Sequence, residues 1–565
     1  MAGVGPPVPE RDVALGGQGE YEQMVGANPM AAPREPALDG NQIQGSVLPG
    51  FMKPHMVVLG LRIDDVGGAK AWLAELAPAV TRLAQAMVSN LAVRNFRGLG
   101  RERIERLGMI PSDMDDAWLS VAFSCEGMAR LLAGGPHAQD LAAFADAGFR
   151  AGMAARSSLL GDPRDSSAEG HPANWVVGSP GGDAVDVLTV VGADYPQTGE
   201  ELLDWVRERA RASGLTVVYE EWGHKLDPIG MEHFGFQDGV SQPGVRGYYS
   251  DDPDSYVTPR KIDPNLVPDT WLYGLPGQNL VWPGEFVFGY PKSAADPLMA
   301  GRVNLPGPWW SRNGSYLVFR RLRQDVAGFW RWVSEQANDL RRAPSFESVT
   351  PEWLAAHIVG RWPSGAPVSR RPDADDPWLG ANRLANDDFG YAASTVAPPG
   401  SESDQWPPAE ADPMGLVCPM SAHIRKVNAR ETPSDLGGHR ASFERRLLRR
   451  GLPYGERLEA PFDEDPQAGD RGLLFLSYQA SIEDQFEFVS RSWMNSPTNP
   501  RSPSGHDLLV GQNATPGANR ERCAGVFAQD GTHVTLMAPA DFVISTGGGY
   551  FFSPSIEALK EVLAK

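Results

Sequence analysis

Cysteine is scarce in this chain, and its scarcity excludes several kinds of protein. The 565 residues include only Cys125, Cys418 and Cys523, and none of the three belongs to a Cys-x-x-Cys pair. Three cysteines are too few for a disulfide framework, and the missing pairs argue against a zinc ribbon or an iron–sulfur cluster. The cysteine content therefore suits a reducing compartment.

Other patterns are missing as well. Acidic residues outnumber basic ones, and the formal net charge of −20 argues against a general nucleic-acid surface and against binding to anionic membranes. No run of about 18 apolar residues is present to span a bilayer. The N-terminal residues lack the basic and apolar regions of a signal peptide, so we expect a cytoplasmic protein. The chain has no Gly-x-Ser-x-Gly elbow, and the glycines at 547–549 precede a strand, where a phosphate loop would precede a helix.

The residues that are present predict an α+β fold. The hydrophobic content of 42% and the charged content of 22% are ordinary for a globular protein. Strands and helices alternate in a β-α-β…β-α-β order, which predicts two ferredoxin-like units, each an antiparallel sheet with flanking helices. The expected strands are 57–63, 118–123, 185–191, 215–219, 285–290, 315–322, 473–478 and 550–552. The expected helices are 69–76, 126–132, 200–213, 326–340, 440–448, 482–494 and 555–563.

Changes in composition predict the domain boundaries. Residues 1–40 are rich in Gly, Pro and Ala and are expected to form a disordered or surface-draped tail. We expect an N-terminal ferredoxin-like domain over 41–230 and a C-terminal one over 231–565. Residues 363–413 carry many Pro, Asp and Gly, which predicts a long loop on the surface.

Asp238 stands between two glycines in the stretch 235–243, GFQDGVSQP. Glycines permit positive φ and close approach of another group, so this carboxylate is expected on a tight, ordered turn. Taken alone, an aspartate in such a turn most often hydrogen-bonds its own backbone. The rest of the chain must therefore supply a chemical partner if Asp238 has a chemical role.

Histidine occurs in two further clusters that indicate a metal. His224, Asp227 and His233 have the spacing of a metal-dependent hydrolase site, although such spacings are common by chance. In the second cluster His423 is followed by basic residues in 421–430, SAHIRKVNAR. Those cations could receive an anionic cofactor while the imidazole reaches a metal.

The stretch 421–430 resembles the proximal-histidine motif of the dye-decolorising peroxidase family, and 235–239, GFQDG, matches that family's GxxDG signature. Further matches follow in the family's order, and the resemblance covers roughly residues 42–565. They are 284–291 (GEFVFGYP), 313–320 (NGSYLVFR), 449–455 (RRGLPYG) and 471–479 (RGLLFLSYQ). Ala429 stands where the family often has proline, a departure that puts no role in doubt.

The resemblance implies a haem b peroxidase that reduces hydrogen peroxide through a ferryl intermediate. The enzyme would oxidise dyes, phenolic or lignin-like compounds by one-electron steps. His423 would be the axial ligand of the iron in the C-terminal unit, Asp238 the distal acid–base group and Arg449 the distal arginine. An acidic working pH with a low-pH limit is expected for bulky dyes, because Asp238 must be ionised to act as a base.

Other residues follow from the same resemblance. Haem contacts are expected at Gly239, Ser241, Asn428 and Arg430 in addition to His423 and Arg449. Glu483 is the expected acceptor of the second ring N–H of His423, with Asp484 next.

Several questions stay open at this point. Surface Trp or Tyr residues are expected to relay electrons from bulky dyes, and Glu285 is one candidate carboxylate for Mn²⁺. A haem-handling protein with little turnover, or the hydrolase built on His224, Asp227 and His233, remain alternatives. Self-association into a homo-oligomer and an encapsulating partner also stay open.

Overall fold

The computed structural model describes residues 34–90, 115–227, 230–250, 255–261, 271–392, 402–459, 469–513, 520–528 and 530–565. Most of the tail expected over 1–40 lies outside these residues. Its last part, 34–40, lies on the body of the protein, where Leu38 is 4% exposed and Ala37 pairs with Tyr248. Among the described helices, none has both the length and the apolar character needed to cross a membrane.

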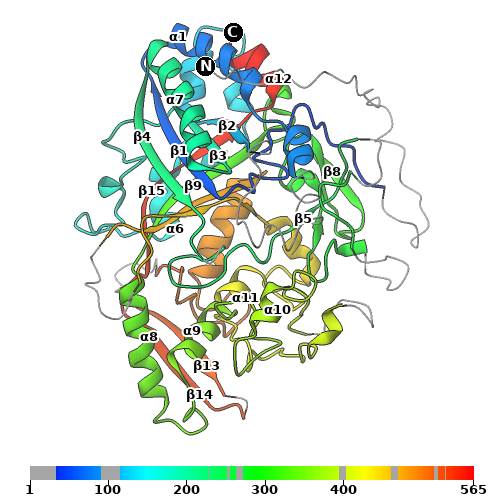
Figure 1. The fold of residues 1–565 in the computed structure, drawn as a ribbon, viewed down its shortest axis with the longest axis vertical. Helices are drawn as coiled ribbons and strands as arrows, with labels where there is room; N and C mark the ends of the chain where they lie inside the picture. Colours follow the sequence, from blue (N-terminus) through cyan, green and yellow to red (C-terminus); the bar gives the residue numbers. More distant parts are fainter. Residues whose placement is uncertain are drawn as a thin grey trace.

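The N-terminal half has the strand order of a ferredoxin-like unit. Its strands are β1 (His55–Ile63), β2 (Ala117–Phe123), β3 (Val187–Ala193) and β4 (Leu215–His224). They are antiparallel neighbours in the order β2-β3-β1-β4. The helices packed here are α1 (Val66–Leu76), α4 (Cys125–Leu132) and α7 (Pro196–Ala212). Figure 1 shows α1 and α7 beside this end of the sheet.

The C-terminal half repeats that order with different strands. Its strands are β9 (Ser315–Gln324), β10 (Leu448–Arg449), β11 (Leu452–Tyr454), β12 (Gly472–Gln479) and β15 (Val543–Ser553). The order is β10-β12-β9-β15, and β11 also pairs with β12. Both predicted ferredoxin-like units are therefore present as strand patterns.

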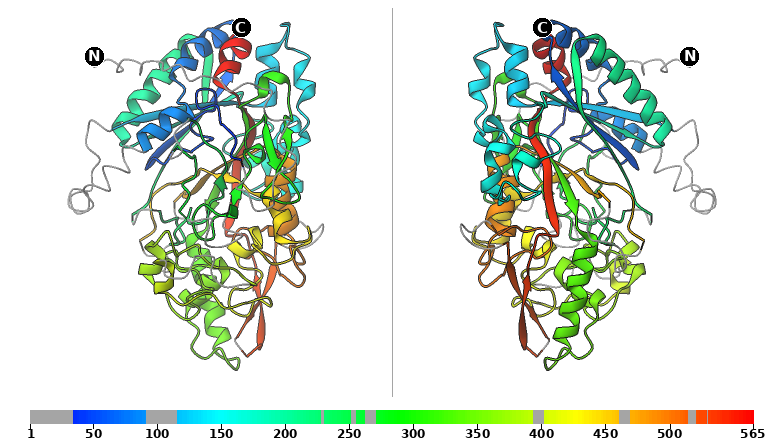
Figure 2. Two further views of the ribbon diagram at one scale, coloured as in Figure 1. Left: turned by 90° about the vertical axis from the view of Figure 1, so that its right-hand side faces the viewer. Right: turned by 90° about the vertical axis from the view of Figure 1, so that its left-hand side faces the viewer.

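The two halves share one nine-stranded sheet, although two separate sheets were expected. β15 pairs with β2 at Phe552 and Phe123, which joins them. At the far edges of the sheet β4 lies close to β11. A Cβ added to Gly223 of β4 would be 3.0 Å from the carbonyl oxygen of Pro453 in β11. The twisted sheet therefore curls toward a barrel, as both views of Figure 2 show.

Side-chain alternation along β1 explains why its sequence is apolar without interruption. Val57, Leu59 and Leu61 point into one core with α1 and α7, whereas Met56 and Val58 point into a second core on the other face. Successive residues of a strand face opposite sides, so a strand buried on both faces reads as one hydrophobic run.

A third layer extends from the C-terminal half. It contains α8 (Val326–Leu340), α9 (Pro351–Val359) and the hairpin of β13 (Arg522–Phe527) with β14 (His533–Ala538). Apolar residues of all four elements share one cluster. Figure 1 shows this layer at the end of the molecule away from α1.

Shorter elements complete the fold. The remaining helices are α5 (Ala147–Ala151), α6 (Met153–Leu160), α10 (Pro377–Ala381), α11 (His423–Val427) and α12 (Ile556–Ala558). The short strands are β5 (Gly244–Val245), β6 (Leu280–Val281), β7 (Tyr290–Ser293) and β8 (Ala300–Asn304). The helices expected at 482–494 and 555–563 are largely π-helical, over Ile482–Glu487, Val489–Met494 and Leu559–Leu563.

Two expectations about secondary structure were wrong, and the surface loop is exposed only in part. The apolar run 285–290 is a turn between a 3₁₀ segment, Pro283–Glu285, and β7, and its residues are buried because the turn packs into the core. The helix expected over 440–448 is a 3₁₀ segment, His439–Arg445, followed by β10. The described part of 363–413 is partly buried, because Val368, Phe389 and Tyr391 lie in the core while Trp378 is 82% exposed.

Candidate functional site

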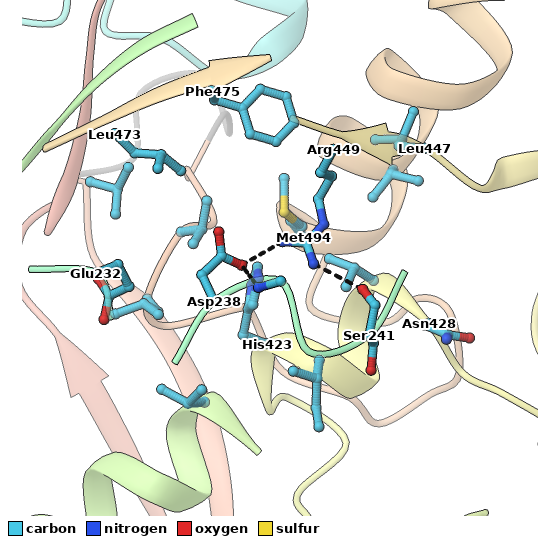
Figure 3. Close-up of a pocket in the computed structure, with 18 of the residues that line it drawn as sticks. Glu232, Asp238, Ser241, His423, Asn428, Leu447, Arg449, Leu473, Phe475 and Met494 are labelled. Atoms are coloured by element: carbon cyan, nitrogen blue, oxygen red, sulfur yellow. Dashed lines mark hydrogen bonds and ion pairs between the residues drawn. The ribbon is translucent and has the colours of Figure 1, made fainter. Parts of the chain in front are cut away.

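A cavity of about 330 Å³ lies in the C-terminal half, a size typical of a small-molecule site. One wall is the sheet face that carries Leu322 of β9 and Leu473 and Phe475 of β12. His423, the first residue of α11, and Met494 of the π-helical segment also line the cavity. Figure 3 shows Leu473, Phe475, His423 and Met494 together with Asp238 and Arg449.

Asp238 reaches the cavity from a tight turn. The backbone N–H of Asp238 donates to the Gly230 carbonyl at 2.8 Å, which closes the loop. Gly235 and Gly239 have φ of 92° and 76°, so the expectation of positive φ at both glycines is confirmed. A Cβ at either position would meet no atom within 4 Å, so the backbone conformation, not crowding within the protein, requires glycine.

Arg449 is the partner of Asp238. Its guanidinium donates to Asp238 Oδ1 at 2.8 Å and to the Ser241 carbonyl at 3.0 Å. The Gln242 side chain holds the Arg449 backbone through two hydrogen bonds of 3.3 Å. Burial opposes ionisation of Asp238. The charge and hydrogen bond of Arg449, with smaller contributions from the Gly239 N–H and from His423, outweigh burial and hold the pKa of Asp238 below its ordinary value.

His423 is oriented by a buried carboxylate. Its Nδ1 lies 2.7 Å from Oδ2 of Asp507, whose side chain is fully buried. The other oxygen, Oδ1, accepts from the backbone N–H groups of Leu509 and Val510. Burial acts to raise the pKa of Asp507, but the contact with His423 outweighs it and keeps that pKa low. An Nδ1–H that donates to a carboxylate leaves Nε2 as the lone-pair nitrogen, which is the tautomer that binds a metal.

The expectation for Glu483 was wrong. Its Oε2 accepts from the backbone N–H of Ala147 at 2.8 Å, and its Oε1 pairs with Arg156 at 3.1 Å. Asp484 pairs with Arg445. Glu483 therefore anchors α5 and α6, while Asp507 occupies the place expected for it. Asp507 lies 84 residues from His423 in the sequence, and only the fold brings the two side chains together. No local motif could therefore identify Asp507 as the partner of His423.

Two of the expected cofactor contacts meet at Asp387. The Ser241 hydroxyl donates to Asp387, and Arg430 contacts the same oxygen at 2.5 Å. Arg361 donates to both Ser241 Oγ and Asp387. Asp387 lies inside 363–413, so this segment contributes a carboxylate to the cavity lining.

The cavity fits a flat, apolar and partly anionic group. Asn428 and Gly239 also line it, as expected. At the edge, the Nε atoms of Arg445 and Arg446 are buried and have no hydrogen-bond partner among the described residues. Burial lowers the pKa of Arg446 to about 10, so an anionic group here would relieve an unfavourable charge. Apolar walls, one oriented imidazole and cations at the edge are the features that haem requires.

The alternative metal site lacks support in the described part of the chain, where no group of three or more His, Cys, Asp and Glu is arranged to hold a metal. The His233 ring contacts the Tyr454 carbonyl at 2.8 Å, and burial lowers its pKa to about 4. His224 sits in β4 opposite His55.

Glu285 does not fit the expectation of an exposed Mn²⁺ ligand. It is fully buried, it accepts from the backbone N–H of Ser293, and burial raises its pKa to about 7.

Comparisons with known proteins agree with this geometry. Residues 42–224 match the family profile described as the DyP dimeric alpha+beta barrel domain, and residues 375–502 match the one described as Dyp-type peroxidase, C-terminal. Dye-decolorizing peroxidase msp1 of Mycetinis scorodonius is 30% identical over 429 residues, which are 74% of this chain and 72% of that protein. Multifunctional dye peroxidase DyP2 of Amycolatopsis sp. is 27% identical over 550 residues, which are 94% of this chain and 97% of that protein.

Solved structures share the fold over nearly the whole length. An ancestral D-type dye decolorizing peroxidase matches with a TM-score of 0.72 at 29% identity, covering 94% of this chain and 100% of that one. A fungal DyP-type peroxidase from Auricularia auricula-judae has a TM-score of 0.69 at 25% identity with the same coverage. Both family profiles, the curated relatives and the solved structures agree, and the chain belongs to the dye-decolorising peroxidase family.

Proposed function

We propose that this haem peroxidase reduces hydrogen peroxide at Asp238 and Arg449 and oxidises dyes and phenolic or lignin-like compounds by one-electron steps. The observation that carries the proposal is the placement of two charge-stabilised groups on one cavity. They are the Asp238–Arg449 ion pair and the His423–Asp507 pair.

The cofactor in this proposal is haem b. His423 Nε2 would bind the iron, Leu473, Phe475 and Met494 would pack on the ring, and Arg445 and Arg446 would face its carboxylates. Bound haem supplies a redox centre that accepts the oxidising equivalents of peroxide. Asp507 strengthens His423 as a donor, because a carboxylate that accepts the second ring N–H makes the imidazole more basic.

Asp238 transfers the proton, and Arg449 stabilises negative charge. Asp238 is held ionised and takes a proton from one oxygen of peroxide, then returns it to the other oxygen, which leaves as water. Arg449 keeps its positive charge throughout and stabilises negative charge on the peroxide. Gln242 fixes the backbone of Arg449, so the cation stays beside the carboxylate.

Phenolic compounds are the proposed reducing substrates. One solved relative, 28% identical with a TM-score of 0.67, is described as a dye-decolorizing peroxidase complex with 2,6-dimethoxyphenol. The cytoplasmic location and the homo-oligomer stay predictions.

Haem reconstitution of the purified protein tests the assignment directly. We expect a haem spectrum with wild type that shifts rapidly on peroxide addition and returns when a phenol is added. The variant His423→Ala should bind haem with a changed spectrum, because it lacks the axial imidazole. An unchanged spectrum in that variant would contradict the ligand assignment, and a spectrum that peroxide leaves unmoved would favour a haem-handling protein.

A further inference from the structure

Glu232 is a second carboxylate on the cavity, and the proposed function gives it no role. It lies on the same loop as Asp238, and both line the cavity, as Figure 3 shows. Glu232 Oε1 accepts from the backbone N–H of Phe236 and Oε2 from that of Phe234, both at 2.9 Å. These two bonds fasten the turn that carries Asp238. Their donors are neutral N–H groups, so they leave the charge of an ionised Glu232 without a counter-charge.

The two carboxylates have opposite electrostatic surroundings. Asp238 is paired with Arg449, whereas Glu232 forms no ion pair with a Lys or Arg of the described chain. Burial, together with the negative charge of Asp238, raises the pKa of Glu232 to about 7, even though three hydrogen bonds lower it. Two side chains face Glu232. Asp238, on the same loop, is charged, and Gln324, on β9, is neutral. Paired groups whose pKa values are pushed apart are suited to separate acid and base roles.

Gln324 is suited to both protonation states of Glu232. Its Nε2 lies 2.5 Å from Glu232 Oε2, while its Oε1 is buried and has no hydrogen-bond partner within the described chain. With the amide nitrogen toward Glu232, Gln324 donates to a carboxylate. After a half-turn of the amide, its oxygen accepts from a protonated carboxyl group.

The reaction needs protons that Asp238 does not supply. The balance is H₂O₂ + 2 e⁻ + 2 H⁺ → 2 H₂O. Asp238 moves one proton between the two peroxide oxygens and ends the step as it began, so the first water takes both of its hydrogens from peroxide. The second oxygen atom leaves as water only after it has received two electrons and two further protons. A phenol releases a proton for each electron it gives, but a donor such as a ferrocene releases none.

We propose that Glu232 is the proton donor for the second water when the reducing substrate brings no proton. Its O–H passes a proton through cavity water to that oxygen atom, and the carboxylate takes a proton back from solvent before the next electron arrives. Gln324 turns its amide as the charge of Glu232 changes. This proposal rests on the proposed peroxidase function and extends it to the reductive half of the cycle.

The variant Glu232→Gln tests the proposal with two donors. One donor is a phenol, and the other is a cationic ferrocene, chosen because the net charge of −20 would repel an anionic donor. Any loosening of the turn that carries Asp238 should lower the peroxide reaction and phenol turnover by the same factor, and we expect ferrocene turnover to fall at least about tenfold further. An equal loss in all three rates would show a structural role for Glu232, and no loss in any rate would overturn the proposal.

Infrared titration supplies a readout independent of turnover. The carbonyl band of a protonated buried carboxyl group should disappear around pH 7, with the same midpoint as the fall in the ferrocene-to-phenol turnover ratio. Glu285 is the matched control, because it is also buried with a pKa of about 7 but does not line the cavity. The band of Glu232 should persist in Glu285→Gln and keep its midpoint. If Glu285→Gln lacks such a band or shifts the turnover ratio, the proposal is wrong, even if Glu232→Gln fails to fold.

Discussion

The two halves of the sheet have the same strand order, but the cavity that holds Asp238 and His423 lies against the C-terminal half. In the N-terminal half α1 and α7 pack on β1, whose residues facing them are Val57, Leu59, Leu61 and Ile63. In the C-terminal half the corresponding helix, α8, packs with α9 and β14 instead of covering β9. Figure 1 shows α8 running away from the sheet. A displaced helix therefore leaves a sheet face free to line a site.

The sequences of the two equivalent strands agree with this difference. Cavity-facing positions of β9 include Arg320, Leu322 and Gln324, two of them polar, whereas the corresponding face of β1 is wholly apolar. Polar groups are tolerated on β9 because they face a cavity or find partners, such as Asp162 for Arg320. The first half thus stabilises the fold, and the second half holds the chemistry.

Removing Asp238, the proposed Brønsted base, should cause the largest loss of activity. In Asp238→Asn the side chain keeps its shape but cannot accept a proton, so the rate of the peroxide reaction should fall by about 10²–10⁴-fold. Stopped-flow spectroscopy of the haem-loaded protein measures this rate, and thermal unfolding serves as the control for folding. An unchanged rate would remove Asp238 from the mechanism.

Arg449→Leu should act through charge and through pH. We expect a loss of about 10²–10³-fold in the peroxide rate, typical of removing one transition-state donor. In wild type the rate should decline as pH falls through the low pKa of Asp238, because protonation removes the base. Without Arg449, burial dominates and raises that pKa, so the decline should begin at higher pH. A pH profile with the same acid limb in both proteins would contradict the pairing.

A conservative change in the N-terminal core should have the smallest effect. Ile63 is 3% exposed in β1, and Ile63→Val should lower the free energy of unfolding by about 0.5–1.5 kcal/mol. The peroxide rate should not change, because this half of the sheet is packed away from the cavity. Chemical denaturation gives the first quantity, and a reduced rate in a fully folded variant would show that the two halves are coupled.

Local sequence patterns predicted some helices and strands correctly and others incorrectly. The helix expected at 326–340 coincides with α8, and the strand at 315–322 lies within β9, because apolar spacing marks both. The run 285–290 was misread as a strand, since an apolar segment buried in a turn has the same composition. The segment 363–413 was expected on the surface but is buried in part, because Pro, Asp and Gly indicate irregular backbone and do not decide exposure.

The candidate site divides in the same way. The family motifs pointed to Asp238, His423 and Arg449, and the structure gathers all three on one cavity. Asp387, Asp507 and Glu232 carried no motif of their own. Their importance comes from which side chain each one faces, and that depends on contacts between segments far apart in the chain.

The sequence by itself determined the strand and helix periodicity, the glycines that permit positive φ around Asp238, and the family motifs. These are local properties, set by side-chain spacing and backbone sterics. Only the tertiary structure decided that one sheet joins both halves and that Asp507, not Glu483, holds His423. It also decided that Glu232 lies near Asp238 with no Lys or Arg of the described residues in an ion pair with it. The reason is that burial and charge pairing depend on distances through space. A glutamate is therefore paired with an arginine in one place, as Glu483 is, and buried with a raised pKa in another, as Glu232 is.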